Sequence, residues 1–189
     1  MTKILKQINL ATLAKADSVS SFFTLFGEVN TEVAQNAISW ILEANYADEP
    51  PEDLTMLVNS EGGSLSDAFA IIDMMRGSSI PVRTIGLGQI ASAGLLIFMS
   101  GQKGHRILTP NTSIMSHQYF WGAAGKVHEL IAVRKEQDLV QDRLMKHIRM
   151  CTGLKDERIN KDLMPPHDVY LTAQEAQKLG ICDHIKEMK

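Results

Sequence analysis

Ser92 is the residue whose neighbours best suit it to act as a nucleophile. It lies in the stretch from Gly88 to Gly94, which reads GQIASAG, immediately before an apolar run. A serine hydroxyl attacks efficiently only when a base removes its proton and fixed donors stabilise the oxyanion that forms. The small neighbours would allow a sharp turn and close approach of a substrate, and a helix that begins at Ser92 would direct the Ala93 amide toward negative charge. The alternative is a small buried serine at a tight helix start.

A base and an orienting carboxylate would have to come from other segments. His117 directly follows a predicted strand at residues 113–115, and the carboxyl ends of strands in an α/β sheet face the crevice where ligands bind. Asp168 precedes a predicted strand at residues 169–171 and is the candidate for the carboxylate. One amide of the glycine pair 62–63 could supply the second oxyanion donor. The remaining histidines that we weighed fit polar turns or solvated faces: His105, His128, His147 and His184.

Other site chemistries find little support in the sequence. Cys151 and Cys182 show no CxxC spacing, which indicates buried thiols in a reducing compartment rather than a disulfide scaffold or a zinc site. His128-Glu129 lacks the second histidine of a zinc peptidase motif, and the GLG of residues 86–88 lacks the third glycine of a dinucleotide fingerprint. We therefore expect neither a metal nor a nucleotide cofactor in this chain.

The bulk composition limits the classes of protein to which the chain can belong. Its 189 residues, of which 44% are hydrophobic and 22% charged, suit one globular domain that spans residues 1–189. The net charge of -3 with no basic run gives no reason to expect a nucleic-acid partner. The apolar residues at the N-terminus are too interrupted for a signal peptide, and the longest apolar run, residues 94–99, is too short to cross a membrane. We expect a cytoplasmic protein.

Short apolar strands alternate with helical patterns, which predicts an α/β fold with a largely parallel sheet. In the first half of the chain, strands are predicted at residues 22–26, 54–58 and 81–85. Each of them ends at or near a turn that contains glycine. Asn30 is a plausible N-cap of the first helix. Ser64 with Asp67 is typical of a capping box that opens the second, and the Ser92 segment opens the third.

The pattern from Lys126 to Met150 predicts one long helix. At about 1.5 Å per residue it would be about 37 Å long, which exceeds what so small a domain can cover. Its additional apolar stripe would need another surface, so self-association is our first interpretation. The alternative is a kinked helix that folds back on the domain.

Several motifs in order resemble those of the ClpP family, the proteolytic subunit of the Clp protease. The resemblance runs from about Phe22 to Ile185 and rests on five stretches: NSEGG at 59–63, GQIASAG at 88–94, IMSHQ at 114–118, HDVYLTAQEA at 167–176 and GICD at 180–183. The likeness implies the fold shared by ClpP and crotonase proteins, with repeated strand-strand-helix units and a protruding handle helix at about residues 125–150.

The resemblance also implies roles for individual residues. The family nucleophile falls on Ser92, its general base on His117 and its orienting carboxylate on Asp168. Its oxyanion-hole amides fall on Gly63 and Ala93. The implied protein is a serine endopeptidase subunit of a hollow barrel of two stacked seven-membered rings, a homo-oligomeric tetradecamer. It would take unfolded polypeptides delivered by a separate AAA+ ATPase, so ATP would be consumed only by that partner.

The sequence departs from the family pattern at three places. Glu61 stands where a proline usually precedes the two glycines, which leads us to expect altered peptide preference or slower turnover. Trp121 stands where the family has a smaller residue. The N-terminal segment 1–21 is shorter than is usual and lacks the family pattern, which puts the axial gate and the ATPase partner in doubt.

Two further classes of function remain alternatives. The first is a non-catalytic or weakly active ring subunit that modifies a host Clp complex. The second is a crotonase-like enzyme that acts on acyl-CoA thioesters. An α/β-hydrolase is disfavoured, because its triad runs Ser, Asp, His along the chain, whereas the order here is Ser92, His117, Asp168.

Overall fold

A seven-stranded, mostly parallel sheet with helices packed against it organises the chain. The computed structural model describes residues 20–188, so nearly all of the predicted segment 1–21 lies outside the described residues. The strands are β1 (Phe22–Val29), β2 (Leu54–Gly63), β3 (Val82–Ala91), β4 (Arg106–Leu108), β5 (Ser113–Ser116), β6 (Val169–Thr172) and β7 (His184–Ile185). The helices are α1 (Thr31–Asn45), α2 (Leu65–Gly77), α3 (Ser92–Met99), α4 (Val127–Thr152), α5 (Asp156–Asp162) and α6 (Ala173–Lys178). The predicted α/β class with a parallel sheet is confirmed.

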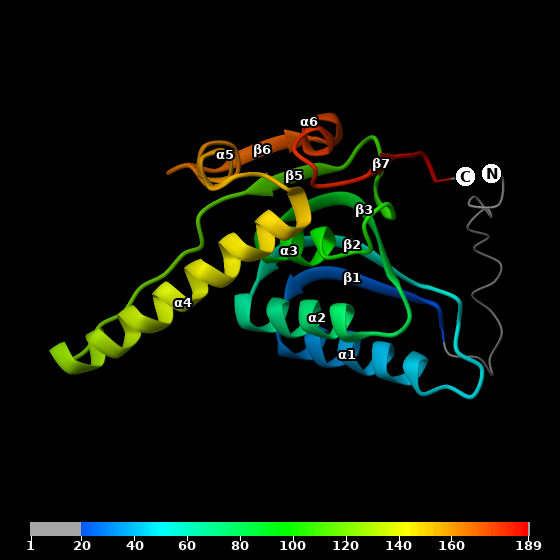
Figure 1. Cartoon of the computed structure of the whole chain (residues 1–189), viewed down its shortest axis with the longest axis horizontal. Coiled ribbons are helices and arrows are strands. Elements are labelled where there is room, and N and C mark those ends of the chain that lie inside the picture. Colours follow the sequence, from blue (N-terminus) through cyan, green and yellow to red (C-terminus); the bar gives the residue numbers. More distant parts are fainter. Residues whose placement is uncertain (1–19, 189) are drawn as a thin grey trace.

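The strand order places the segments of the predicted site next to one another. The main path of the sheet runs β1-β2-β3-β4-β7, all in parallel, and β5 pairs with the far end of β3. β6 then adds to β5 as the antiparallel pair of the sheet. Figure 1 shows α1 and α2 together on one side of β1 and β2, whereas β6 and α6 lie beyond β5 at the opposite side of the molecule.

The helix starts follow from side-chain caps. The Asn30 side chain accepts a hydrogen bond from the Val33 amide, and Ser64 accepts one from the Asp67 amide. Only half of the predicted Ser64–Asp67 capping box forms, because the Ser64 amide donates to Val29 O in the neighbouring strand instead. These caps fix where α1 and α2 begin relative to the sheet.

The predicted ends of the first three strands are wrong. β1 continues through Gly27 to Val29, β2 through the expected loop to Gly63, and β3 through its two glycines to Ala91. Parallel pairing resumes after a register shift in each case, with Glu28 opposite Gly62 and Ser60 opposite Ile90. Glycine tolerates such bulges, so here it bends the strands without ending them.

Helix α4 has a buried end and an exposed end. Leu144, Met145 and Ile148 pack into the core, whereas Val127 and Ile131 are 77% and 67% exposed. The helix is continuous and extends well beyond the sheet, which excludes the kinked alternative (Figure 1). Its bounds differ from the predicted Lys126 to Met150 by one residue at the start and two at the end.

The prediction that His147 lies on a solvated face is wrong. Its side chain is 2% exposed, with Nε2 2.9 Å from Leu96 O in α3 and Nδ1 2.8 Å from an Arg76 guanidinium nitrogen in α2. Burial lowers the pKa of His147 to about 4, and the positive charge of Arg76 acts in the same direction. The neutral ring therefore joins three helices behind the sheet.

The two cysteines differ in burial. Cys182 is buried, as predicted, and burial raises the pKa of its thiol to about 11. Cys151 is only partly buried, and burial raises its pKa as well.

Candidate active site

Ser92 stands at a sharp junction between β3 and α3. Its φ of +51° makes it the one non-glycine residue in the left-handed region among residues 20–188. An L-residue in that conformation costs about 1–2 kcal/mol, so the surrounding packing must hold it there. The flanking Ala91 and Ala93 are almost fully buried, whereas Ser92 keeps partial exposure. The turn thus directs one hydroxyl out of a close-packed segment.

The pairing of the strands brings His117 and Asp168 to this hydroxyl. Met115 of β5 lies opposite Ala91 of β3, so the chain leaves β5 beside the start of α3. Ser116 in turn pairs with Val169 of β6. His117 and Asp168 are the next residues on the two strands, and they meet at the same edge of the sheet as Ser92.

The two contacts of the His117 ring differ in length. Its Nε2 lies 2.8 Å from Ser92 Oγ, a hydrogen bond, whereas its Nδ1 lies 3.8 Å from Asp168 Oδ1. The latter distance is that of a loose charge contact and exceeds hydrogen-bonding range. The histidine side chain is 27% exposed and that of Asp168 is 53% exposed. The nucleophile and base are therefore preformed, and the acid is close but free to shift.

Two hydrogen bonds attach the residues next to His117 to the segment that precedes Asp168. Ser116 Oγ donates to Leu163 O at 2.6 Å, and the Gln118 amide donates to Met164 O at 3.0 Å. These bonds flank His117 on both sides along the chain. They therefore anchor the residues on either side of His117 to the segment that precedes Asp168.

The glycine pair of β2 passes directly over the beginning of α3. A Cβ on Gly62 would lie 2.7 Å from Ser92 Cβ and 2.9 Å from the Ala93 nitrogen, so only glycine fits. The Gly62 amide donates to Ser60 Oγ at 3.1 Å, which removes it as an oxyanion donor and leaves Gly63 of the predicted pair. Ala93 is the second residue of α3, where backbone amides have no partner within the helix.

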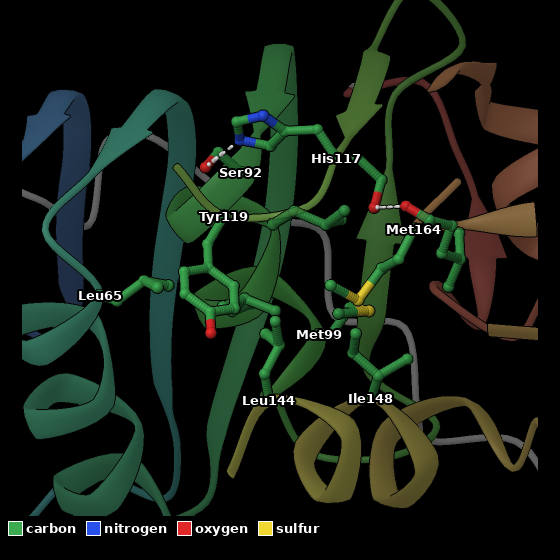
Figure 2. Close-up of a pocket in the computed structure, with 12 residues that line it drawn as sticks. Leu65, Ser92, Met99, His117, Tyr119, Leu144, Ile148 and Met164 are labelled. Atoms are coloured by element: carbon green, nitrogen blue, oxygen red, sulfur yellow. Dashed lines mark hydrogen bonds between the residues drawn. The ribbon is translucent and has the colours of Figure 1, made fainter. Parts of the chain in front are cut away.

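A small apolar cavity opens beside the Ser92–His117 pair (Figure 2). Its free volume is about 20 Å³. Residues from α2, α3, α4, the β5–α4 loop and the segment before β6 line it: Leu65, Leu95, Leu96, Met99, Tyr119, Leu144, Ile148, Leu163 and Met164, together with Ser116. A group bound here would lie next to the serine hydroxyl.

The other candidate histidines have different surroundings. His117 is the histidine that hydrogen-bonds Ser92 within the described part of the chain. His128 and His184 are exposed, on α4 and β7, and His105 is half-buried before β4. No cluster of three or more His, Cys, Asp or Glu side chains suited to a metal occurs among residues 20–188. Within the same residues, none of the helices combines the length and apolar character that crossing a membrane requires.

Comparison with known protein families identifies the relatives of this chain. The sequence model of the Clp protease family matches residues 12–189. The chain belongs to the Clp protease family. The match covers every element of the fold described above, including the long helix α4.

Two features of this Clp protease family member were missed from the sequence. Ser60 holds the Gly62 amide and also donates to Gly27 O at 2.6 Å, which fixes the bend where β1 and β2 change register. The cavity was missed as well, although the i, i+4 spacing of Leu144 and Ile148 marked a buried face of α4. Both features depend on contacts between distant segments.

Proposed function

We propose that this chain is a serine endopeptidase subunit that cleaves peptides and unfolded polypeptides. Ser92 is the nucleophile, His117 the general base and Asp168 the carboxylate that orients the imidazole. The observation that carries the proposal is the 2.8 Å contact between His117 Nε2 and Ser92 Oγ, at a serine held in a strained turn. Membership of the Clp protease family supports the same chemistry.

The reaction follows from the order of these contacts. Ser92 Oγ attacks the scissile carbonyl carbon while His117 Nε2 takes its proton, which gives a tetrahedral oxyanion. The imidazolium then returns the proton to the leaving amine, and the C–N bond breaks to leave an acyl-enzyme. Water, deprotonated by the same histidine, then attacks the acyl carbonyl carbon, and the bond to Ser92 Oγ breaks as the imidazolium returns the proton to Oγ and the acid product leaves. Asp168 near Nδ1 favours the tautomer in which Nε2 is free to accept the proton.

The oxyanion in this proposal is held by the amides of Gly63 and Ala93. Ala93 contributes the positive end of a helix dipole as well as its N–H group. The substrate would bind extended, with its backbone beside the glycine pair of β2, so that main-chain contacts supply most of the affinity. We expect cleavage to depend little on side chains outside the cavity beside Ser92.

We further propose that the active particle is a homo-oligomeric barrel of two stacked heptameric rings in the cytoplasm, served by an AAA+ ATPase. The exposed apolar residues on the outer end of α4 support self-association: Val127, Leu130, Ile131 and Leu139. Exposed apolar residues gathered on one helix are typical of a surface that contacts another protein. ATP would be hydrolysed by the separate partner.

The alternative of a weakly active ring subunit is favoured by one observation, the 3.8 Å gap between His117 Nδ1 and Asp168 Oδ1. A histidine without a firmly bound carboxylate holds its reactive tautomer less strictly. Such a chain would enter rings and contribute little cleavage. The crotonase-like alternative has no comparable support, because acyl-CoA chemistry does not need this serine and histidine.

Two measurements test the proposal together. A fluorophosphonate probe should label the wild type at Ser92, and Ser92→Ala should lose both labelling and peptide hydrolysis. Light scattering on the same samples should report a discrete large particle for both proteins, since Ser92 is remote from the outer end of α4. Assembled wild-type particles that neither label nor cleave would favour the non-catalytic subunit. Cleavage that survives in Ser92→Ala would refute the assignment of the nucleophile.

A further inference from the structure

The cavity beside Ser92 is where the side chain of the residue before the scissile bond would lie. It opens next to both Ser92 and His117, and the rest of its walls is mostly apolar. The polar Ser116 in its wall already donates to Leu163 O, so it offers little to a polar ligand. An uncharged, apolar group is therefore the occupant that the lining favours.

The size of the cavity limits that group. A free volume of about 20 Å³ is little more than that of one water-sized sphere. A methyl group fits such a space, whereas a leucine or phenylalanine side chain requires a wall to move. The walls from the core are poorly able to move, because Met99, Leu144, Ile148, Leu163 and Met164 are all buried.

Tyr119 differs from the buried residues that line the cavity because it lies in a loop at its surface. It lies two residues after His117, in the loop that joins β5 to α4, and is only partly buried. Its ring lies between the Ser92–His117 pair and α4 in Figure 2, near Leu65. Its hydroxyl donates one long hydrogen bond, 3.3 Å, to Gln137 O on α4. Shortening this side chain would enlarge the cavity from its partly exposed side, while the buried core residues of the other walls stay unchanged.

We propose that Tyr119 is a specificity-determining residue, whose ring restricts the residue before the scissile bond to small apolar side chains such as alanine. The inference rests on the proposed peptidase function and adds the substrate class to it. The ring, rather than the hydroxyl, fills the space, so a phenylalanine at this position would impose the same limit. Smaller residues at position 119 would admit leucine and phenylalanine side chains.

The test is a peptide series that differs only in the residue before the scissile bond: Ala, Val, Leu and Phe. For wild type we expect kcat/KM to be at least tenfold higher with Ala than with Leu, because a pocket of fixed size discriminates methylene groups by about 10- to 200-fold. Tyr119→Ala should reverse or abolish this preference, moving the Leu/Ala ratio by about tenfold or more. Tyr119→Phe should keep the wild-type ranking.

Controls separate the effect of the ring from general damage. Phe120→Ala alters the neighbouring aromatic residue, which is 95% exposed and does not line the cavity, and should leave the ranking unchanged. Tyr119→Leu provides a second, better-packed variant if Tyr119→Ala does not fold. Phosphonate probes that carry an alanine or a leucine side chain provide a second measurement. Their relative rates of labelling report which side chain the cavity accepts, without requiring turnover.

Failure of this inference differs from failure of the proposed function. Ser92-dependent cleavage with the same ranking in wild type and Tyr119→Ala would overturn the role of Tyr119 alone. A wild type that prefers leucine or phenylalanine peptides would also overturn the role of Tyr119, since it would mean that the tyrosine ring moves out of the cavity. The absence of cleavage and of labelling with every peptide and probe would overturn both.

Discussion

The two sides of the candidate site are built differently. On the serine side, Ser92 and the Gly62 backbone are in van der Waals contact, held by three strands and α3. On the acid side, Asp168 is more than half exposed and stands 3.8 Å from the imidazole. The serine side is therefore preorganised, and the acid side is adjustable. The position of Asp168 relative to the imidazole is thus the part of the candidate site that the packing fixes least.

The largest expected effect comes from disturbing the serine side. Gly62→Ala would force a methyl group against Ser92 and the Ala93 amide, and the neighbouring atoms are mostly backbone, which cannot yield cheaply. Since losing one oxyanion donor costs about 10²–10³-fold in kcat, we expect a loss near 10³-fold in peptide hydrolysis.

Gly104→Ala is the matched control for Gly62→Ala. Gly104 has a similar φ of +89° but nothing within 4 Å of its Cβ position. Gly104→Ala should lower the free energy of unfolding by about 1 kcal/mol and leave kcat unchanged. Equal activity of Gly62→Ala and Gly104→Ala would show that the serine side is not tightly packed.

The buried His147 supports the serine side from behind, and its contribution depends on pH. The folded state holds the pKa of His147 near 4, against about 6.5 when unfolded, so the unfolded state binds the proton more tightly. Its stabilising contribution is complete above about pH 6.5 and is lost as the pH falls toward 4. The difference amounts to about 3 kcal/mol.

Denaturant unfolding at fixed protein concentration between pH 7.5 and 4 measures this loss. His147→Gln should remove that part of the pH dependence, and His128→Gln, on the exposed end of the same helix, should retain it. Parallel curves for wild type and His147→Gln would mean that folding does not change the pKa of the ring, which would contradict the predicted loss of stability.

On the acid side, Asp168→Asn should lower kcat with little change in KM. A buried, hydrogen-bonded carboxylate in this role is worth about 10⁴-fold, and the exposed position and 3.8 Å distance of Asp168 lead us to expect about 10²-fold. Asp156→Asn, which alters an exposed carboxylate on α5, serves as the control. A loss near 10⁴-fold would show that Asp168 closes onto the imidazole in the working particle.

The smallest expected effect belongs to Glu61, an exposed carboxylate next to Gly62. Exposed charge pairs are worth up to about 1 kcal/mol, so Glu61→Pro should change the relative kcat/KM of basic and acidic peptides by about two- to fivefold. The expected direction is a loss for peptides with lysine or arginine near the scissile bond. Kinetics that match the wild type across the peptide panel would leave Glu61 without a role in preference.

The sequence predicted most of the element types and the residues that meet, but it missed α5 and β7 and gave no distances between the residues. Strand-end position was enough to select His117, because parallel strands end at one edge of a sheet. The gap to Asp168 was not predictable, since it depends on the path of an exposed loop. His147 was misassigned although it shares a helix face with Leu144 and Cys151, because histidine on a charged helix suggests solvent. The glycines were interpreted as strand ends. In the structure, β1, β2 and β3 continue past their glycines because they remain paired with neighbouring strands.

Helix α4 joins the periphery of the molecule to the cavity beside Ser92. Its inner end supplies Leu144 and Ile148 to the cavity wall, and its outer end projects about 25 Å beyond them. One continuous helix therefore presents both the exposed outer end and part of the wall of the cavity beside Ser92.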